Sequence, residues 1–182
     1  MQKAIGMIEF KTVSAGITAA DQMVKTSDVE ILEAQTVCPG KYVAIIAGDL
    51  SAVRAAVERA RATRPEELIY DFVLGNPDPS IFPAIYGTSQ VENVSALGIL
   101  ETYDAASIIV AADIAAKTAI VQLIELRIAK VMCGKSYLLI TGEVAACEAA
   151  IAAATESVGE KGMFLDSSVI AHPDAQICKT IL

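Results

Sequence analysis

The sequence predicts an α/β (α+β) protein built from two tandem copies of a ferredoxin-like βαββαβ unit. Two observations predict this fold: the chain repeats itself at a nearly constant offset, and each copy alternates short apolar runs with segments of helical periodicity. A third observation concerns association. The 182 residues are 54% hydrophobic, with a mean hydropathy of +0.50. A small monomer cannot bury that much apolar surface, so we expect subunit interfaces.

The repeat is an ordered series of matching segments. Ala4–Glu9 (AIGMIE) returns as Ala96–Glu101 (ALGILE), and Lys25-Thr26 returns as Lys117-Thr118, each at an offset of 92. Chance gives one such match but not a series in order. The chain is therefore a duplicated domain, with copies expected at residues 1–88 and 93–182, joined by the polar, turn-forming stretch 87–90.

The offset changes once, at one of the expected loops. Beyond Val37 it becomes 94, because Gly40-Lys41 matches Gly134-Lys135. Two residues are therefore inserted in the second copy, between Ala129 and Gly134.

Each copy has the same expected elements. Ile17, Ala20 and Val24 share one face of the first expected helix, and the helix at 105–117 is apolar almost all round, so it is buried as core or against another subunit. A second helix in each copy carries an apolar stripe in the same phase. The expected elements are strands at 4–9, 29–37, 42–47, 68–74 and 163–170, with helices at 13–25, 105–117 and around 53–60.

Composition excludes several classes of function. The formal charge is −8, with no basic patch, so nucleic acid is not an expected partner. The longest uncharged helical stretch is too short to cross a bilayer, and charges interrupt the first apolar run, so we expect neither a membrane partner nor a secretory signal. Four cysteines without a CxxC pair predict reduced thiols in the cytoplasm. One histidine, His172, leaves no metal site or catalytic triad, so we do not expect an enzyme.

Several segments resemble one known family. Ala4–Glu9, the stretch from Gly16 to Lys25, Gly40-Lys41-Tyr42 and Gly48–Val53 are similar to the shell domain of bacterial microcompartments (the BMC domain), and the resemblance covers both repeats. Residues 36–42 and 156–162 are most similar to the tandem-domain shell proteins of propanediol-utilisation compartments.

The resemblance implies an assembly. Three chains are expected to form a pseudo-hexameric homotrimer, a flat tile that joins other microcompartment shell proteins edge to edge. The edge lysine of the family corresponds to Lys25 and Lys117, although a lone helix lysine is usually just solvated. The Pro-Arg-Pro-His segment often found near the end of the family's domain is absent: the corresponding stretches are 76–79 and 170–173, and neither contains the arginine.

The resemblance also implies a pore and a cofactor. The loop between the second and third strands lines the central pore in this family, which assigns pore-loop positions to Val37, Cys38, Pro39, Gly40, Met132, Cys133 and Gly134. In tandem relatives the cysteine corresponding to Cys38 binds a [4Fe-4S] cluster on the three-fold axis. Three copies of Cys38 would hold one cluster per trimer, for electron transfer or redox sensing across the shell, with lumen redox enzymes as partners.

Alternatives remain open from the sequence. Cys133 is the rival ligand, because the insertion makes its alignment ambiguous, whereas Cys147 belongs to a helix stripe and Cys178 lies near the C-terminus. A plain tile with an open pore and no cluster is one alternative function. A ferredoxin-like regulatory oligomer that binds a small ligand between subunits is another, although it explains neither the paired lysines nor the Cys38 loop.

Overall fold

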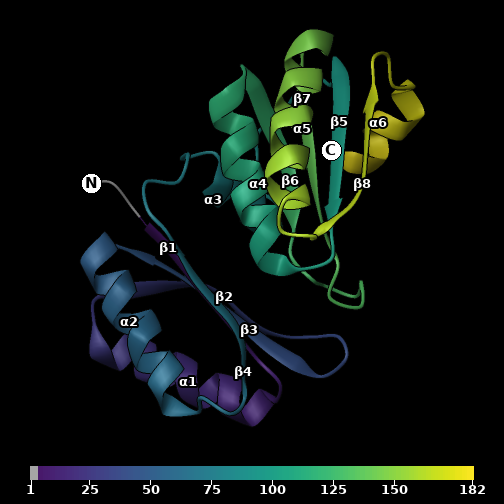
Figure 1. The fold of residues 1–182 in the computed structure, drawn as a ribbon. Helices are drawn as coiled ribbons and strands as arrows, with labels where there is room; N and C mark the ends of the chain where they lie inside the picture. Colours follow the sequence, from purple (N-terminus) through teal and green to yellow (C-terminus); the bar gives the residue numbers. More distant parts are fainter. Residues whose placement is uncertain (1–3) are drawn as a thin grey trace. The chain divides into compact units, whose positions relative to one another are not determined.

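The computed structural model describes residues 4–182, and the same six elements occur twice (Figure 1). The βαββαβ order predicted from the repeat is confirmed in both copies. The first copy consists of β1 (Ala4–Phe10), α1 (Val13–Thr26), β2 (Val29–Val37), β3 (Lys41–Gly48), α2 (Leu50–Thr63) and β4 (Leu68–Leu74). The second consists of β5 (Ala96–Thr102), α4 (Ala105–Thr118), β6 (Val121–Arg127), β7 (Ser136–Gly142), α5 (Val144–Gly159) and β8 (Phe164–Ile170).

Each copy forms its own four-stranded antiparallel sheet. The strand order is β2-β3-β1-β4 in the first and β6-β7-β5-β8 in the second. In the first copy α1 and α2 cover one face, which Figure 1 shows below its sheet, and the second copy has α4 and α5 in the equivalent places. Successive residues of a strand point to opposite faces, so each sheet has one face toward its two helices and a second face away from them. The side chains on this second face are buried as well, such as Ile5 and Met7 in the first copy and Leu97 in the second.

Two short helices were not predicted, α3 (Ile81–Tyr86) and α6 (Ala175–Ile181). The chain divides into two compact units between Pro77 and Asp78, and α3 packs against β6 in the second unit through Ile81, Ala84 and Ile85. The repeat places residues 78–88 at the end of the first copy, whereas Ile81, Ala84 and Ile85 are buried within the second compact unit.

The core of the first unit lies between its helices and its sheet, and of the predicted α1 stripe only Ala20 belongs to it. Ile17 and Val24 are exposed, and the buried side of the helix is formed by smaller residues around Gly16 and Met23. A Cβ at Gly16 would lie 2.4 Å from Cβ of Tyr42, so the missing side chain is what lets α1 approach the sheet this closely. Because α1 lies so close to the sheet, the helix packs against it with the face around Gly16 and not with the face of Ile17 and Val24.

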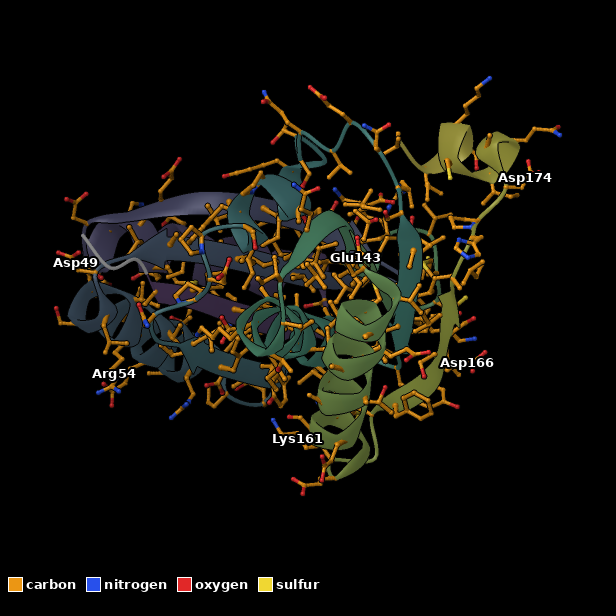
Figure 2. The ribbon with its side chains drawn as sticks, turned by 90° about the horizontal axis from the view of Figure 1, so that it is seen from above. Asp49, Arg54, Glu143, Lys161, Asp166 and Asp174 are labelled. Atoms are coloured by element: carbon orange, nitrogen blue, oxygen red, sulfur yellow. The ribbon has the colours of Figure 1, made fainter. Side chains whose placement is uncertain are left out.

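The remaining helices follow the expected pattern. The second-helix stripes are buried as predicted, by Val53, Ala56, Val57 and Ala60 in α2 and by Cys147, Ala150, Ile151 and Ala154 in α5. Nine residues of α4 are buried, in agreement with its all-round apolar character. Figure 2 shows two charged side chains at the surface, Arg54 on the outer side of α2 and Lys161 just beyond the end of α5. Within residues 4–182 no helix is long and apolar enough to cross a membrane.

Candidate functional site

Cys38 lies in a three-residue turn that joins β2 to β3. Val37 and Lys41 are cross-strand partners, so residues 38–40 alone reverse the chain, at the tip of the hairpin visible in Figure 1. The backbone N–H of Gly40 donates to the carbonyl of Val37 over 2.9 Å and closes the turn. Gly40 has φ +105°, a conformation that glycine adopts without a steric penalty, and the Cys38–Pro39 peptide bond is cis. The Cys38 thiol is free and half-buried.

The corresponding loop of the second copy is longer and differently built. β6 ends at Arg127 and β7 begins at Ser136, so residues 128–135 form the connection. Ala129, Val131 and Cys133 all have positive φ, and the Val131 side chain is 93% exposed. The two-residue insertion therefore converts a tight turn into a wide loop, and Cys133 is exposed on it. The two loop cysteines, Cys38 and Cys133, lie at nearly equivalent positions of the two copies, but their backbone environments differ.

The other two cysteines have structural surroundings. Cys147 is fully buried in the α5 stripe, and its thiol lies 3.9 Å from the carbonyl of Ala96. Burial raises the pKa of the Cys147 thiol, which keeps it protonated and poorly suited to bind iron. Cys178 is half-buried on α6, 3.9 Å from the carbonyl of Pro173. His172 is exposed. No group of three His, Cys, Asp or Glu side chains that could hold a metal occurs in the described part of a single chain.

The two repeat-equivalent lysines are both paired within their own helices. Lys25 donates to Asp21 and Lys117 to Asp113, each over 2.7 Å and each at an i, i+4 spacing near the end of the helix. Lys25 and Asp21 are well exposed, whereas the Asp113 side chain is only 10% exposed and also accepts a hydrogen bond from the backbone of Asp78. Exposed ion pairs of this kind contribute little to stability. Lys25 is therefore placed for an external contact at small cost to the fold.

A polar cluster beside α6, on the face of the second sheet that lies away from α4 and α5, was missed by sequence reasoning. The carboxylate of Glu125 accepts hydrogen bonds from Arg127 and, over 2.7 Å, from the Tyr137 hydroxyl, and these side chains line a cavity of about 340 Å³ next to α6. Partial burial and the hydrogen bond to Glu125 raise the pKa of Tyr137. At the equivalent positions the first copy has Glu33, Gln35 and Val43. This difference between the copies was the signal that a comparison of the repeats could have used.

A buried ion pair was also missed. Glu9 on β1 and Lys41 at the start of β3 form a salt bridge on the face of the first sheet that lies away from α1 and α2. The Glu9 side chain is only 8% exposed, and Lys41 directly follows the Cys38 turn. The turn is thus connected to the central strand β1 by this side-chain contact as well as by the backbone pairing of the strands.

These features define a class of protein: a tandem repeat of two α/β units, each with a free cysteine in the connection between its second and third strands. Comparison with known proteins identifies the family. The model of the BMC domain matches residues 4–77 and again residues 96–173. The chain therefore belongs to the BMC-domain family and contains the domain twice, as the resemblance of its motifs implied.

Relatives and a solved structure agree with this assignment. The chain is 37% identical over 173 residues to the bacterial microcompartment shell protein PduT of Citrobacter freundii, covering 95% of this chain and 94% of that protein. It is 39% identical over 61 residues to the shell protein PduA of the same organism, covering 34% of this chain and 66% of that one. A crystal structure of a microcompartment protein from Desulfitobacterium hafniense DCB superposes with a TM-score of 0.95 at 40% identity, covering 98% of this chain and 99% of that chain.

Proposed function

We propose that this protein is a structural shell subunit of a bacterial microcompartment, a homotrimer that carries a [4Fe-4S] cluster on its three-fold axis through Cys38. The observation that carries the proposal is the Cys38 turn. It presents one free, half-buried thiol per chain on a short reversal closed by a backbone hydrogen bond. A preorganised loop of this kind is what a metal ligand requires.

The shell role rests on the family and on the duplication. PduT of Citrobacter freundii, which the chain matches over nearly the whole length of both proteins, is named as a shell protein, and the tandem domain makes three chains equivalent to six single domains. Such a trimer forms a pseudo-hexagonal tile that joins other shell proteins at its edges. We assign it no catalytic activity, because the relatives that it resembles are named as shell proteins.

The donor chemistry of Cys38 fits the cluster. Thiolates are the usual ligands of iron–sulfur clusters, and a three-fold axis brings three identical thiols to one point. Three thiols bind three irons of a cubane, so the fourth iron needs a ligand that is not a symmetric protein side chain. When bound, the cluster supplies one-electron redox chemistry at the pore. Electron transfer to lumen redox enzymes and redox sensing are both consistent with that position.

The experiment that tests the proposal is anaerobic purification followed by four measurements on the same sample. Light scattering gives the number of chains, iron and acid-labile sulfide are assayed, and absorbance and EPR spectra are recorded. We expect a brown trimer with about four irons and four sulfides per three chains. A colourless trimer would overturn the cluster and leave a plain shell tile with an open pore. A monomer at micromolar concentration would overturn the tile, and a colourless oligomer that binds a small ligand would favour a regulatory module.

A further inference from the structure

The Cys38 turn is held on its C-terminal side by a residue that is itself anchored. Lys41 is the first residue after the turn and the cross-strand partner of Val37. Its neighbour on the central strand is set by the β1–β3 register, in which Glu9 lies opposite Val43. Glu9 and Lys41 are therefore diagonal neighbours on the same face of the sheet, a spacing that a long side chain can bridge. The salt bridge between them spans this diagonal.

Burial makes this contact costly to break. The side chains of Glu9 and Lys41 are only 8% and 26% exposed. A buried carboxylate without its cation is strongly unfavourable, whereas the intact pair adds little net stability compared with apolar side chains. The net stability that the pair contributes therefore does not explain it. Its structural effect does: the pair holds the start of β3 against β1.

The second copy supplies a natural comparison. Glu101 and Lys135 are the repeat-equivalents of Glu9 and Lys41. Lys135 is exposed, β7 begins only after it, and within the described residues no ion pair joins it to Glu101. Both copies thus contain the residue types, but the contact forms only where the loop is a tight Cys-Pro-Gly turn. The two inserted residues place Lys135 in the wide loop.

We propose that the Glu9–Lys41 ion pair is the positioning element of the Cys38 turn: it anchors the turn to the central strand and sets the charge beside the metal-binding thiol. The part that concerns the metal rests on the proposed function. Lys41 acts through the turn and touches no ligand. Outer residues that orient a metal ligand typically alter metal affinity by roughly 10–100-fold when they are replaced.

The test uses four variants of the full-length trimer. Glu9→Gln and Lys41→Gln each remove one charge, the double variant removes both, and Lys135→Gln is the matched control in the second copy. Because Lys41→Gln leaves Glu9 buried and unpaired, it can fail to fold. The double variant avoids this unpaired charge and keeps the test decisive.

The first readout needs no metal. Hydrogen exchange at the Gly40 amide reports on the hydrogen bond that closes the turn. We expect the double variant to accelerate this exchange at least about tenfold in the metal-free trimer, a local loosening of about 1.4 kcal/mol by the usual conversion. Lys135→Gln should leave the exchange rate at Gly40 unchanged. Equal rates in the double variant and in the control would overturn the anchoring.

The second readout uses the iron-loaded trimer. The double variant should lose iron to a chelator roughly 10–100-fold faster than the wild type. The midpoint potential should rise in Glu9→Gln and fall in Lys41→Gln, because added positive charge favours the reduced cluster. Shifts in the same direction, or none, would overturn the electrostatic part. A wild-type trimer without iron would overturn the cluster itself, while the exchange rate at Gly40 would still decide whether the pair anchors the turn.

Discussion

Replacing Cys38 with serine should abolish iron binding and leave the fold and the trimer unchanged. The thiol is half-buried in a turn that is closed by a backbone hydrogen bond, so its sulfur contributes little packing. Substitutions at such positions usually change the free energy of unfolding by less than about 0.5 kcal/mol. The effect on iron should be total, because the symmetry of the trimer removes all three thiol ligands at once and a serine oxygen is a poor ligand for an iron–sulfur cluster.

The same substitution at Cys147 should have the opposite effect. This side chain is fully buried, and its thiol lies 3.9 Å from the carbonyl of Ala96, which is too far for a good hydroxyl hydrogen bond. A poorly bonded hydroxyl in the core costs about 1–3 kcal/mol. For a chain of this size each kcal/mol lowers the melting temperature by about 2–4 °C, so we expect a decrease of about 2–12 °C with iron retained.

The assay compares iron per trimer, oligomeric mass and melting temperature for Cys38→Ser, Cys147→Ser and Cys133→Ser, all handled anaerobically from lysis onward. Cys133→Ser is the decisive control, because its cysteine lies in the equivalent loop. Iron that is lost with Cys133→Ser and retained with Cys38→Ser would refute the choice of loop. Iron that is retained in all three variants would refute cysteine ligation by either loop.

Three further predictions concern the tile edges, the core of the first unit and the polar cluster around Tyr137. Replacing Lys25 and Lys117 with Glu should keep the trimer but abolish sheets seen by electron microscopy, because like charges would meet at each edge; sheets that persist would show that both lysines are only solvated. Gly16→Ala should lower the free energy of unfolding by about 1–3 kcal/mol in urea titrations, because its Cβ would lie 2.4 Å from that of Tyr42; an unchanged midpoint would contradict the close packing. Tyr137→Phe should cost about 1 kcal/mol near pH 8, since it removes the hydrogen bond donated to a neighbouring carboxylate. The raised pKa of the tyrosine means that its stabilisation is full below about pH 10 and is lost as the pH rises through the folded-state pKa, so the difference from the variant should shrink in alkaline urea titrations; a constant difference would contradict it.

The fold could be predicted almost completely because the duplication provides two independent readings of each element. The stripes of α2 and α5 agree in phase, so the helices and their buried faces were both predictable. The buried face of α1 was not, because Gly16 permits an approach that favours small residues over Ile17 and Val24. α3 and α6 were missed because each is too short for helical periodicity to be read.

The candidate site was predictable only in part, and for a definite physical reason. Sequence alone can identify Cys38 as a thiol next to proline and glycine, because turn chemistry is local. The Glu9–Lys41 contact depends on strand register over more than thirty positions of the chain, which no local pattern specifies. The repeat does not reveal it either, because Glu101 and Lys135 provide the same two residue types in the second copy, where no ion pair joins them within residues 4–182. What differs between the copies is loop length: a three-residue reversal places Lys41 at the first pair of β3, beside the central strand, and the insertion removes Lys135 from that position. Loop length thus determines which copy of a duplicated residue pair can act on the site.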